Sequence, residues 1–527
     1  MNANSAFMGS IVIGNGINVG IICLARYYEE RRKGASHLVG IELMIQRTAT
    51  ATWTAAMAAG LAYGSLMLTS FRGFSQFGVI GFIGMMACWI CTFIFLPAFL
   101  TVIYGRGAHP DFEKQPSHPV MRFLGAGIQR YPYQFTIVAA GITAAFLVVM
   151  LTFRGDVLET DLTKLRDVHS MEHGSGHYGK IAEGIFGRTL TPTVIMAHSP
   201  EEAREIRKRL VAKKEKDGAE SLMLDVKSID DFLPTAQSQK EPLIRKIDRL
   251  LTPQVKRHLA PADRDLVAQF INPDVFEPVV QSSLPPMVLD KFTEKSGAVG
   301  NLVLIYPRLD CLYWKGDQLR RFIEDIRSVA ASVSPTAPVA GQLAVSSDLI
   351  GAIWRDGPRA TLLAFGAVTI LVFLIFRNFK TSMQVLISLL LGVVWLGACM
   401  VIFRIKINFM NFIALPITFG IGVDYGVNIF ERYREEGPGR IIEVIQTTGG
   451  AVVLASMTTI IGYGSLLLAG NLAFVSFGQI AILGELCCIM TAVVVAPAVL
   501  VSIARAKGHL APVPESGVAS EKIGAEG

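Results

Sequence analysis

One carboxylate stands inside an apolar stretch of the second half of the chain. Asp424 lies between Gly422 and Gly426, in a run from 408 to 430 that is long enough to cross a bilayer as a helix. Inserting a carboxylate there costs about 2.5–3.5 kcal/mol, and such a group normally faces the protein interior. Burial disfavours its ionised form, which suits it to bind and release protons. We therefore predict a proton carrier, with a purely structural buried acid as the alternative.

Other polar side chains in apolar stretches extend this site. Tyr425 follows Asp424 directly, and Glu485 lies in the middle of the run 476–503. We interpret Glu485 as a second buried proton or substrate site, or as a structural pair with another helix. Thr459, with Thr458 beside it, is a candidate hydroxyl partner, although such residues commonly bond their own i−4 carbonyl in membrane helices.

No pattern predicts catalytic or metal chemistry. The nucleotide-binding sequence G-x-x-x-x-G-K-[ST] and the zinc sequence H-E-x-x-H do not occur. His169, His173 and His177 are four residues apart, but Gly174 and Gly176 argue against a stable helix there. We therefore predict a protein that is not an enzyme and that has no cofactor or metal. Basic runs interleaved with aromatic residues are also missing, so we expect no nucleic-acid partner.

The composition is that of an integral membrane protein. Of 527 residues, 51% are hydrophobic and 17% charged, and the mean hydropathy is +0.44. Soluble domains carry about 25% charged residues, which excludes an ordinary cytosolic enzyme. Nine apolar stretches are long enough to span a bilayer: 5–25, 50–70, 77–103, 133–153, 359–376, 383–403, 408–430, 449–469 and 476–503.

Basic residues give the orientation of these stretches. They gather in the connections that lie on one side of the membrane, and the net charge is +6. The positive-inside rule makes this side cytoplasmic, so we expect a multi-pass protein of the bacterial inner membrane with one large periplasmic loop. The predicted domains are three helices of a first membrane repeat (1–105), a cytoplasmic linker (106–132), a transmembrane helix (133–153), the periplasmic domain (154–358), a second repeat of five helices (359–503) and a cytoplasmic tail (504–527).

The large loop alternates strands and helices. Strands are expected at Thr193–Ala197, near Leu222–Ile229, at Leu302–Tyr306 and at Val339–Ala340. Ser199-Pro200-Glu201-Glu202 is typical of a helix start and predicts a helix to Lys216. Further helices are expected at Asp317–Val333 and around Leu243–Leu259. The fold class is therefore an α-helical polytopic membrane protein with an α/β domain of ferredoxin-like βαβ units.

The membrane part contains an internal repeat. Ile11–Glu30 aligns with Ile417–Glu436, and later Tyr63-Gly64-Ser65-Leu66 equals Tyr463-Gly464-Ser465-Leu466. Both copies have the same orientation, so this is a parallel repeat about an axis along the membrane normal. Asn18 stands where the second copy has Asp424, and it either hydrogen-bonds Asp424 or packs helices. Matched glycines are expected to allow close helix packing: Gly14, Gly16, Gly20, Gly420, Gly422 and Gly426.

The two copies differ in what precedes them. Two spans, the large loop and one further span precede the second copy, whereas Asn2 already aligns with Asn408. We therefore expect a truncated or split transporter, with an N-terminal partner half or a homo-oligomer as its partner.

The sequence G-x-G-x-D-Y-G at Gly420–Gly426, followed by Glu431-Arg432-Tyr433, resembles a signature of the resistance–nodulation–division superfamily. Specifically, the chain resembles the MMPL-type lipid exporters. Leu158–Leu162 and Leu190–Thr193 are similar to the hopanoid-transporter branch. The resemblance implies periplasmic porter domains and proton-driven export of hydrophobic molecules, with Asp424 as the relay acid and Tyr425 beside it.

We therefore predict export of a hopanoid or related lipid, driven by the proton-motive force. The partners would be the lipid, protons and the membrane. The predicted relay residues are Asp424, Tyr425, Asn18, Glu485 and Thr459. Two alternatives remain: a sterol-sensing-like protein that binds lipid without transporting it, and a protein-translocation motor of the same superfamily.

Overall fold

The computed structural model describes residues 8–104, 119–270, 278–309, 316–437 and 440–508. The chain divides into two compact units. A helical unit comprises Met1–Glu159, Thr163–His169 and Leu349–Gly527, and an α/β unit comprises Thr160–Leu162 and Ser170–Asp348. The first seven residues lie outside the described residues. So do residues 509–527 of the predicted tail 504–527 and residues 106–118 of the predicted linker 106–132.

Long apolar helices build the helical unit. Within the described residues, eight helices are long and apolar enough to cross a membrane, and the chain is a multi-pass membrane protein. The main helices are α2 (Met8–Arg32), α3 (His37–Gly64), α4 (Arg72–Tyr104), α5 (Pro119–Arg130), α6 (Pro132–Thr152), α15 (Gln342–Phe376), α16 (Phe379–Ile402), α17 (Ala414–Glu436), α19 (Gly450–Gly464), α20 (Leu472–Met490) and α21 (Ala496–Ala506).

The predicted stretch 50–70 is the exception among the nine. It falls within α3 and the short helix η1 (Ser65–Leu68), and α3 is not among the eight apolar helices. The reason is composition: Glu42 and Arg47 occupy its first half, and Thr, Ala and Gly fill its second half. These small residues leave α3 well buried, which is typical of a helix that packs closely on both sides.

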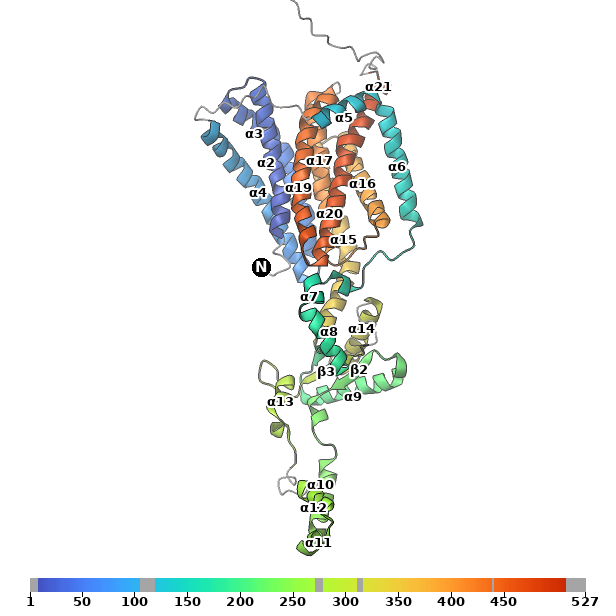
Figure 1. Cartoon of the computed structure of the whole chain (residues 1–527). Helices are drawn as coiled ribbons and strands as arrows, with labels where there is room; N and C mark the ends of the chain where they lie inside the picture. Colours follow the sequence, from blue (N-terminus) through green and yellow to red (C-terminus); the bar gives the residue numbers. More distant parts are fainter. Residues whose placement is uncertain (1–7, 105–118, 271–277, 310–315, 438–439, 509–527) are drawn as a thin grey trace, which may run out of the picture. The chain divides into compact units, whose positions relative to one another are not determined.

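The two repeats pack crosswise. α17 of the second copy lies mainly along α3 of the first, and α2 of the first copy lies mainly along α19 of the second. The helix that begins each repeat therefore packs against the next helix of the other repeat. α16 covers α17 and α20, and α6 packs against α16 and α21 at the edge of the bundle opposite α2–α4 (Figure 1). Small residues meet at some of these contacts, such as Gly14 of α2 and Gly462 of α19, where a Cβ added at Gly14 would lie 3.6 Å from the Gly462 Cα, in ordinary van der Waals contact.

The repeats also differ in helix type. Two π-helical segments interrupt the second copy, η10 (Ile445–Gly449) between α18 (Ile441–Val444) and α19, and η12 (Thr491–Val495) between α20 and α21. The equivalent residues of the first copy lie inside the uninterrupted α-helices α3 and α4. The predicted stretch 476–503 is therefore a helix with a π-turn rather than a continuous α-helix.

The α/β unit contains the predicted ferredoxin-like arrangement. Its strands are β1 (Thr193–Met196), β2 (Met223–Lys227), β3 (Leu302–Pro307) and β4 (Val339–Ala340), in the sheet order β2-β3-β1-β4 with antiparallel neighbours. α9 (Pro200–Asp217) joins β1 to β2, and α14 (Gly316–Val333) joins β3 to β4. Each βαβ unit is therefore split by a strand of the other.

Charged pairs connect the two helices of this unit. Lys213 on α9 lies 3.1 Å from Asp217 and 3.2 Å from Asp325 of α14. The hydrogen bond to Asp217, assisted by that to Asp325, raises the pKa of the Lys213 ammonium group. The predicted start of α9 is confirmed, since the Ser199 hydroxyl accepts a hydrogen bond from the Glu202 backbone at 3.2 Å.

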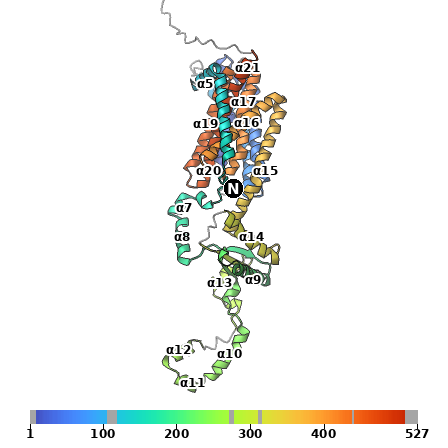
Figure 2. The ribbon, with the colours of Figure 1, turned by 90° about the vertical axis from the view of Figure 1, so that its right-hand side faces the viewer.

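One helix prediction for the large loop needs correction. The stretch Leu243–Leu259 is divided between α10 (Gln237–Leu250) and α11 (Pro253–His258), because Thr252 caps α11 and Pro253 begins it. α10, α11 and α12 (Pro261–Phe270) lie apart from the sheet (Figures 1 and 2). As Gly174 and Gly176 led us to expect, the three histidines do not share a helix, since α7 (Val168–Glu172) ends before Gly174 and α8 (Ser175–Phe186) begins after it.

Candidate functional site

Asp424 is held by its own helix. It lies on α17, the most deeply buried of the eight apolar helices, and its side chain is 7% exposed. The amide of Asn428, one turn further along, donates hydrogen bonds to the Asp424 carboxylate and, at 2.9 Å, to the Asp424 carbonyl. This geometry presents one carboxylate oxygen to a polar partner inside an otherwise apolar helix.

Tyr425 and Glu485 form a second pair beside Asp424. The hydroxyl of Tyr425 donates a hydrogen bond to the carboxylate of Glu485 on α20, and both side chains are at most 3% exposed. Glu485 also lies within electrostatic range of Asp424. Three of the five predicted relay residues are therefore neighbours, and two buried carboxyl groups lie close enough together to influence each other's ionisation.

Asn18 and Thr459 form a separate contact. The Thr459 hydroxyl lies 3.3 Å from the Asn18 carbonyl oxygen and 3.2 Å from the backbone oxygen of Gly14. The expected hydrogen bond between Asn18 and Asp424 is not formed, because α2 packs along α19 rather than along α17. The structure instead shows the helix-packing alternative for Asn18. Thr459 lies near its own i−4 carbonyl as well, at 3.3 Å from Ala455.

Four of the six matched glycines lie at close helix contacts. A Cβ atom added at Gly420 would lie 2.7 Å from the Cα of Ala59, and one at Gly422 would lie 2.7 Å from the sulfur of Cys488. A side chain at either position would require neighbouring atoms to shift. The remaining added Cβ distances are 2.5 Å to Cys88 at Gly16, 3.2 Å to Val385 at Gly426, 3.6 Å to Gly462 at Gly14 and 3.9 Å to Thr92 at Gly20.

A third polar cluster was not predicted. The amide of Asn15 on α2 donates hydrogen bonds to the hydroxyls of Tyr63 at 2.7 Å and Tyr463 at 3.1 Å. All three side chains are at most 3% exposed. The only sequence signal was the Tyr-Gly-Ser-Leu match between the repeats, since Asn15 aligns with the apolar Ile421.

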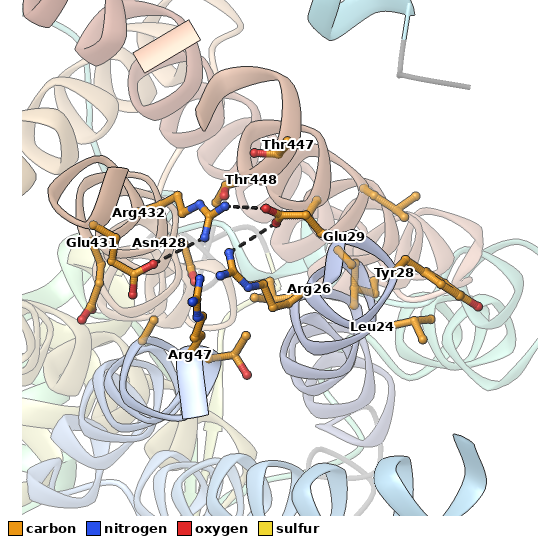
Figure 3. Close-up of a pocket in the computed structure, with 18 of the residues that line it drawn as sticks. Leu24, Arg26, Tyr28, Glu29, Arg47, Asn428, Glu431, Arg432, Thr447 and Thr448 are labelled. Carbon is orange, nitrogen blue, oxygen red and sulfur yellow. Dashed lines mark hydrogen bonds and ion pairs between the residues drawn. The ribbon is translucent and has the colours of Figure 1, made fainter. Parts of the chain in front are cut away.

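A cavity lined by both polar and apolar side chains opens beside Asn428 (Figure 3). Its volume is about 440 Å³, and its walls come from α2, α3, α17, η10 and α19. The charged and amide side chains in its lining, with two threonines, are Arg26, Glu29, Arg32, Arg47, Asn428, Glu431, Arg432, Glu435, Gln446, Thr447 and Thr448. Because Asn428 both lines this cavity and binds Asp424, a single side chain separates the cavity from the buried carboxylate.

An ion-pair network crosses this cavity. Within each copy the pairs follow the helix spacing, such as Arg26–Glu30 at 2.9 Å and Arg432–Glu436 at 2.9 Å. Arg432 also reaches the other copy and contacts Glu29 at 2.6 Å (Figure 3). Both arginine side chains are only 6% exposed, so the network is a buried connection between the repeats.

Comparisons with known proteins cover nearly the whole chain. A family model described as the MMPL family matches residues 2–135 and 314–517. A hopanoid transporter HpnN from Burkholderia multivorans is 24% identical, over 94% of this chain and 60% of its own length. The HpnN of Rhodopseudomonas palustris is 23% identical, over 89% and 58%. The chain thus spans about three fifths of the length of these curated relatives.

A solved structure is similar in fold. The crystal structure of SecDF, a translocon-associated membrane protein from Thermus thermophilus, superimposes with a TM-score of 0.50 and 14% sequence identity. The match covers 95% of this chain and 55% of that one. At this identity the likeness concerns the fold alone, a helical membrane bundle with a small α/β domain.

Proposed function

The chain belongs to the MMPL family, and on that premise we propose that it exports a lipid of the hopanoid class or a related apolar molecule from the bacterial inner membrane. The proton-motive force drives this export, and the protein is not an enzyme. The observation that carries the proposal is the buried group of Asp424, Tyr425 and Glu485 in the helical unit. The names of the two similar hopanoid transporters support the lipid substrate.

Asp424 is the proton carrier in this proposal. A carboxylate is costly inside a membrane and is retained where it is functional. The polar side chains of the cavity beside Asn428 offer protons a route between Asp424 and the end of the bundle that carries Arg26 and Arg432. By the positive-inside rule this end faces the cytoplasm, and the α/β unit then belongs to the periplasm, where it guides the lipid.

The uncovered side of α4 supports a partner in the membrane. Ile94, Phe95 and Phe99 of α4 are between 60% and 66% exposed. In the second copy, Val495 stands in the position of Phe95 and is 7% exposed, because α16 and α6 pack on that part of the bundle. We propose that equivalent helices, from an N-terminal half or another copy of the chain, cover α4.

Complementation tests the proposal. Source cells that lack the gene receive either the wild-type gene or the Asp424→Asn variant, and the hopanoid content of inner and outer membranes is measured. We expect wild type to restore hopanoid to the outer membrane, and Asp424→Asn to accumulate in the membrane without restoring it. Glu443→Gln, which changes a half-exposed carboxylate, serves as the matched control. Normal hopanoid distribution in the Asp424→Asn cells would contradict proton coupling through this residue.

A further inference from the structure

The cluster of Asn15, Tyr63 and Tyr463 joins both repeats at one point. Asn15 comes from α2, Tyr63 from α3 of the same copy and Tyr463 from α19 of the other copy. The Tyr463 hydroxyl also lies 3.3 Å from the Asn15 carbonyl oxygen, so the amide and this hydroxyl can exchange donor and acceptor roles. Asn15 therefore connects the hydroxyls of the two tyrosines.

This cluster and the cavity lie on opposite sides of Asp424 along α17. Gly420, one turn before Asp424, packs against Ala59 and Ala62 of α3, and Tyr63 follows directly. Asn428, one turn after Asp424, lines the cavity. Following α17 from its first residue, the order is the tyrosine cluster, the buried carboxyl groups and then the cavity.

The cluster also lies close to the buried carboxyl groups along the contact between α3 and α17. Tyr63 follows Ala62, which meets α17 at Gly420, one turn before Asp424. Tyr425, the next residue after Asp424, donates a hydrogen bond to Glu485. Cys488 lies one turn from Glu485 on α20. The polar side chains thus form a series from Tyr463 through Asn15 and Tyr63 to Glu485, Asp424 and Asn428.

Packing alone does not account for the polarity of the cluster. Tyr63 packs against Phe77 in a tilted arrangement and Tyr463 against Phe477 edge to face, with ring centroids 6.2 Å and 6.0 Å apart. The rings therefore have the same apolar partner in both copies, and phenylalanine would make the same contacts. The hydroxyls have instead a single shared polar partner, Asn15, which has no counterpart in the second copy.

We propose that Asn15, Tyr63 and Tyr463 form the segment of the proton path that leads to Glu485 and Asp424 from the side opposite the cavity. This inference rests on the proposed proton-driven function. Each tyrosine passes its hydroxyl proton inward and receives another from the side opposite the cavity, so the hydroxyl is unchanged after each transfer. Asn15 holds the two hydroxyls in line. Glu485 and Asp424 are the acceptors, and Asn428 and the cavity lead the proton onward.

The test measures proton flux through the full chain. Purified protein is reconstituted into vesicles of phosphatidylethanolamine and phosphatidylglycerol that contain the pH dye pyranine, and a pH gradient is imposed. Tyr63→Phe and Tyr463→Phe each remove one hydroxyl and keep the ring contact. Loss of a positioned proton-transfer group typically lowers a rate by about 100-fold or more, and we expect a fall of at least about tenfold in each variant.

A matched control separates the path from general damage. Tyr27 is also fully buried, but its hydroxyl contacts His37 at 2.7 Å, away from the cluster. Tyr27→Phe should leave the proton flux within about twofold of wild type, since Tyr27 shares no partner with the cluster and substitutions at separate sites act independently. Thermal unfolding in detergent checks that each variant folds, and Asn15→Leu supplies a third variant of similar volume if a tyrosine variant does not fold.

Infrared spectroscopy after a pH jump distinguishes a path from a structural role. In Tyr63→Phe and Tyr463→Phe the carboxyl bands of Asp424 and Glu485 should reach their wild-type amplitude, but more slowly. Wild-type flux and wild-type band kinetics in both variants, with flux abolished in Asp424→Asn, would overturn the inference and leave the proposed function standing. If the wild-type chain itself conducts no protons, the proposed function fails and the inference fails with it.

Discussion

Arg432 on α17 and Glu29 on α2 form an ion pair of 2.6 Å between residues 403 positions apart in the sequence. Each also pairs within its own copy, Arg432 with Glu436 and Glu29 with Arg26. The pair therefore joins two local networks into one buried network between the repeats. The pair also lies in the wall of the cavity. A change in how the two repeats pack at this pair would therefore also change the access of protons to Asn428 and Asp424.

Glu29→Gln should destabilise the helical unit. Glu29 is the partner that Arg26 and Arg432 share. Its loss leaves Arg26 with Glu30 and Arg432 with Glu436, and a hydrogen bond to a charged group contributes about 1.5–3 kcal/mol. The matched control is Glu435→Gln, which affects a 39% exposed carboxylate that contacts Arg432 alone. Thermal unfolding in detergent should show a much larger loss for Glu29→Gln, and equal losses would contradict a special role for the pair between the repeats.

Tyr425→Phe and Glu485→Gln should have non-additive effects. Their side chains share one buried hydrogen bond, and a hydrogen bond to a charged group contributes about 1.5–3 kcal/mol. Once either side chain is replaced, the shared hydrogen bond is already lost, so the second substitution lowers the free energy of unfolding little further. A double-mutant cycle on unfolding free energy and on proton flux measures this coupling. Additive effects in both measurements would show that the two residues act independently.

Gly420→Ala should damage the contact between α17 and α3. The added Cβ would lie 2.7 Å from both the Cα of Ala59 and the Cβ of Ala62, and overpacking of this kind costs about 1–3 kcal/mol. Gly141→Ala on α6 is the control, since an added Cβ there meets nothing within 4 Å. The yield of monodisperse protein in detergent should fall for Gly420→Ala only. A normal yield of that variant would mean that the helices can separate without penalty.

Thr459→Val should loosen the contact between α19 and α2 without stopping proton movement. The Thr459 hydroxyl binds Asn18 and the Gly14 carbonyl, and neither of these contacts involves Asp424. We expect a loss of about 1 kcal/mol in unfolding free energy, the usual contribution of one hydrogen bond, and proton flux close to wild type in the vesicle assay. Abolished flux in a stable Thr459→Val protein would place Thr459 on the proton path after all.

Local signals predicted the α/β unit well. The strand at Leu302 and the helix start at Ser199 follow from alternation and capping, which depend on neighbouring residues only, and both are found where expected. The apolar stretches likewise predicted the long helices, except that α3 gains its burial from Thr, Ala and Gly rather than from a strongly apolar sequence.

The contacts between helices were harder to predict. Alignment of the repeats shows that Asn18 and Asp424 are equivalent, but equivalent residues need not touch, and the crosswise packing of α2 on α19 separates them. For the same reason Arg432–Glu29 and the Asn15 cluster were missed. Phe74 and Phe77 are also buried, at 5% and 2% exposed. Phe74 packs on Phe412 of the second copy, a long-range contact that no local pattern records.

The two π-turns have a consequence for the symmetry of the bundle. Successive residues of an α-helix are rotated by about 100°, and a π-turn contains one residue more than an α-turn. In the second copy η10 and η12 therefore each add a residue to a turn that is α-helical in α3 and α4. One duplicated sequence thus yields two unequal halves, although Tyr63 and Tyr463 still pack on equivalent residues, Phe77 and Phe477.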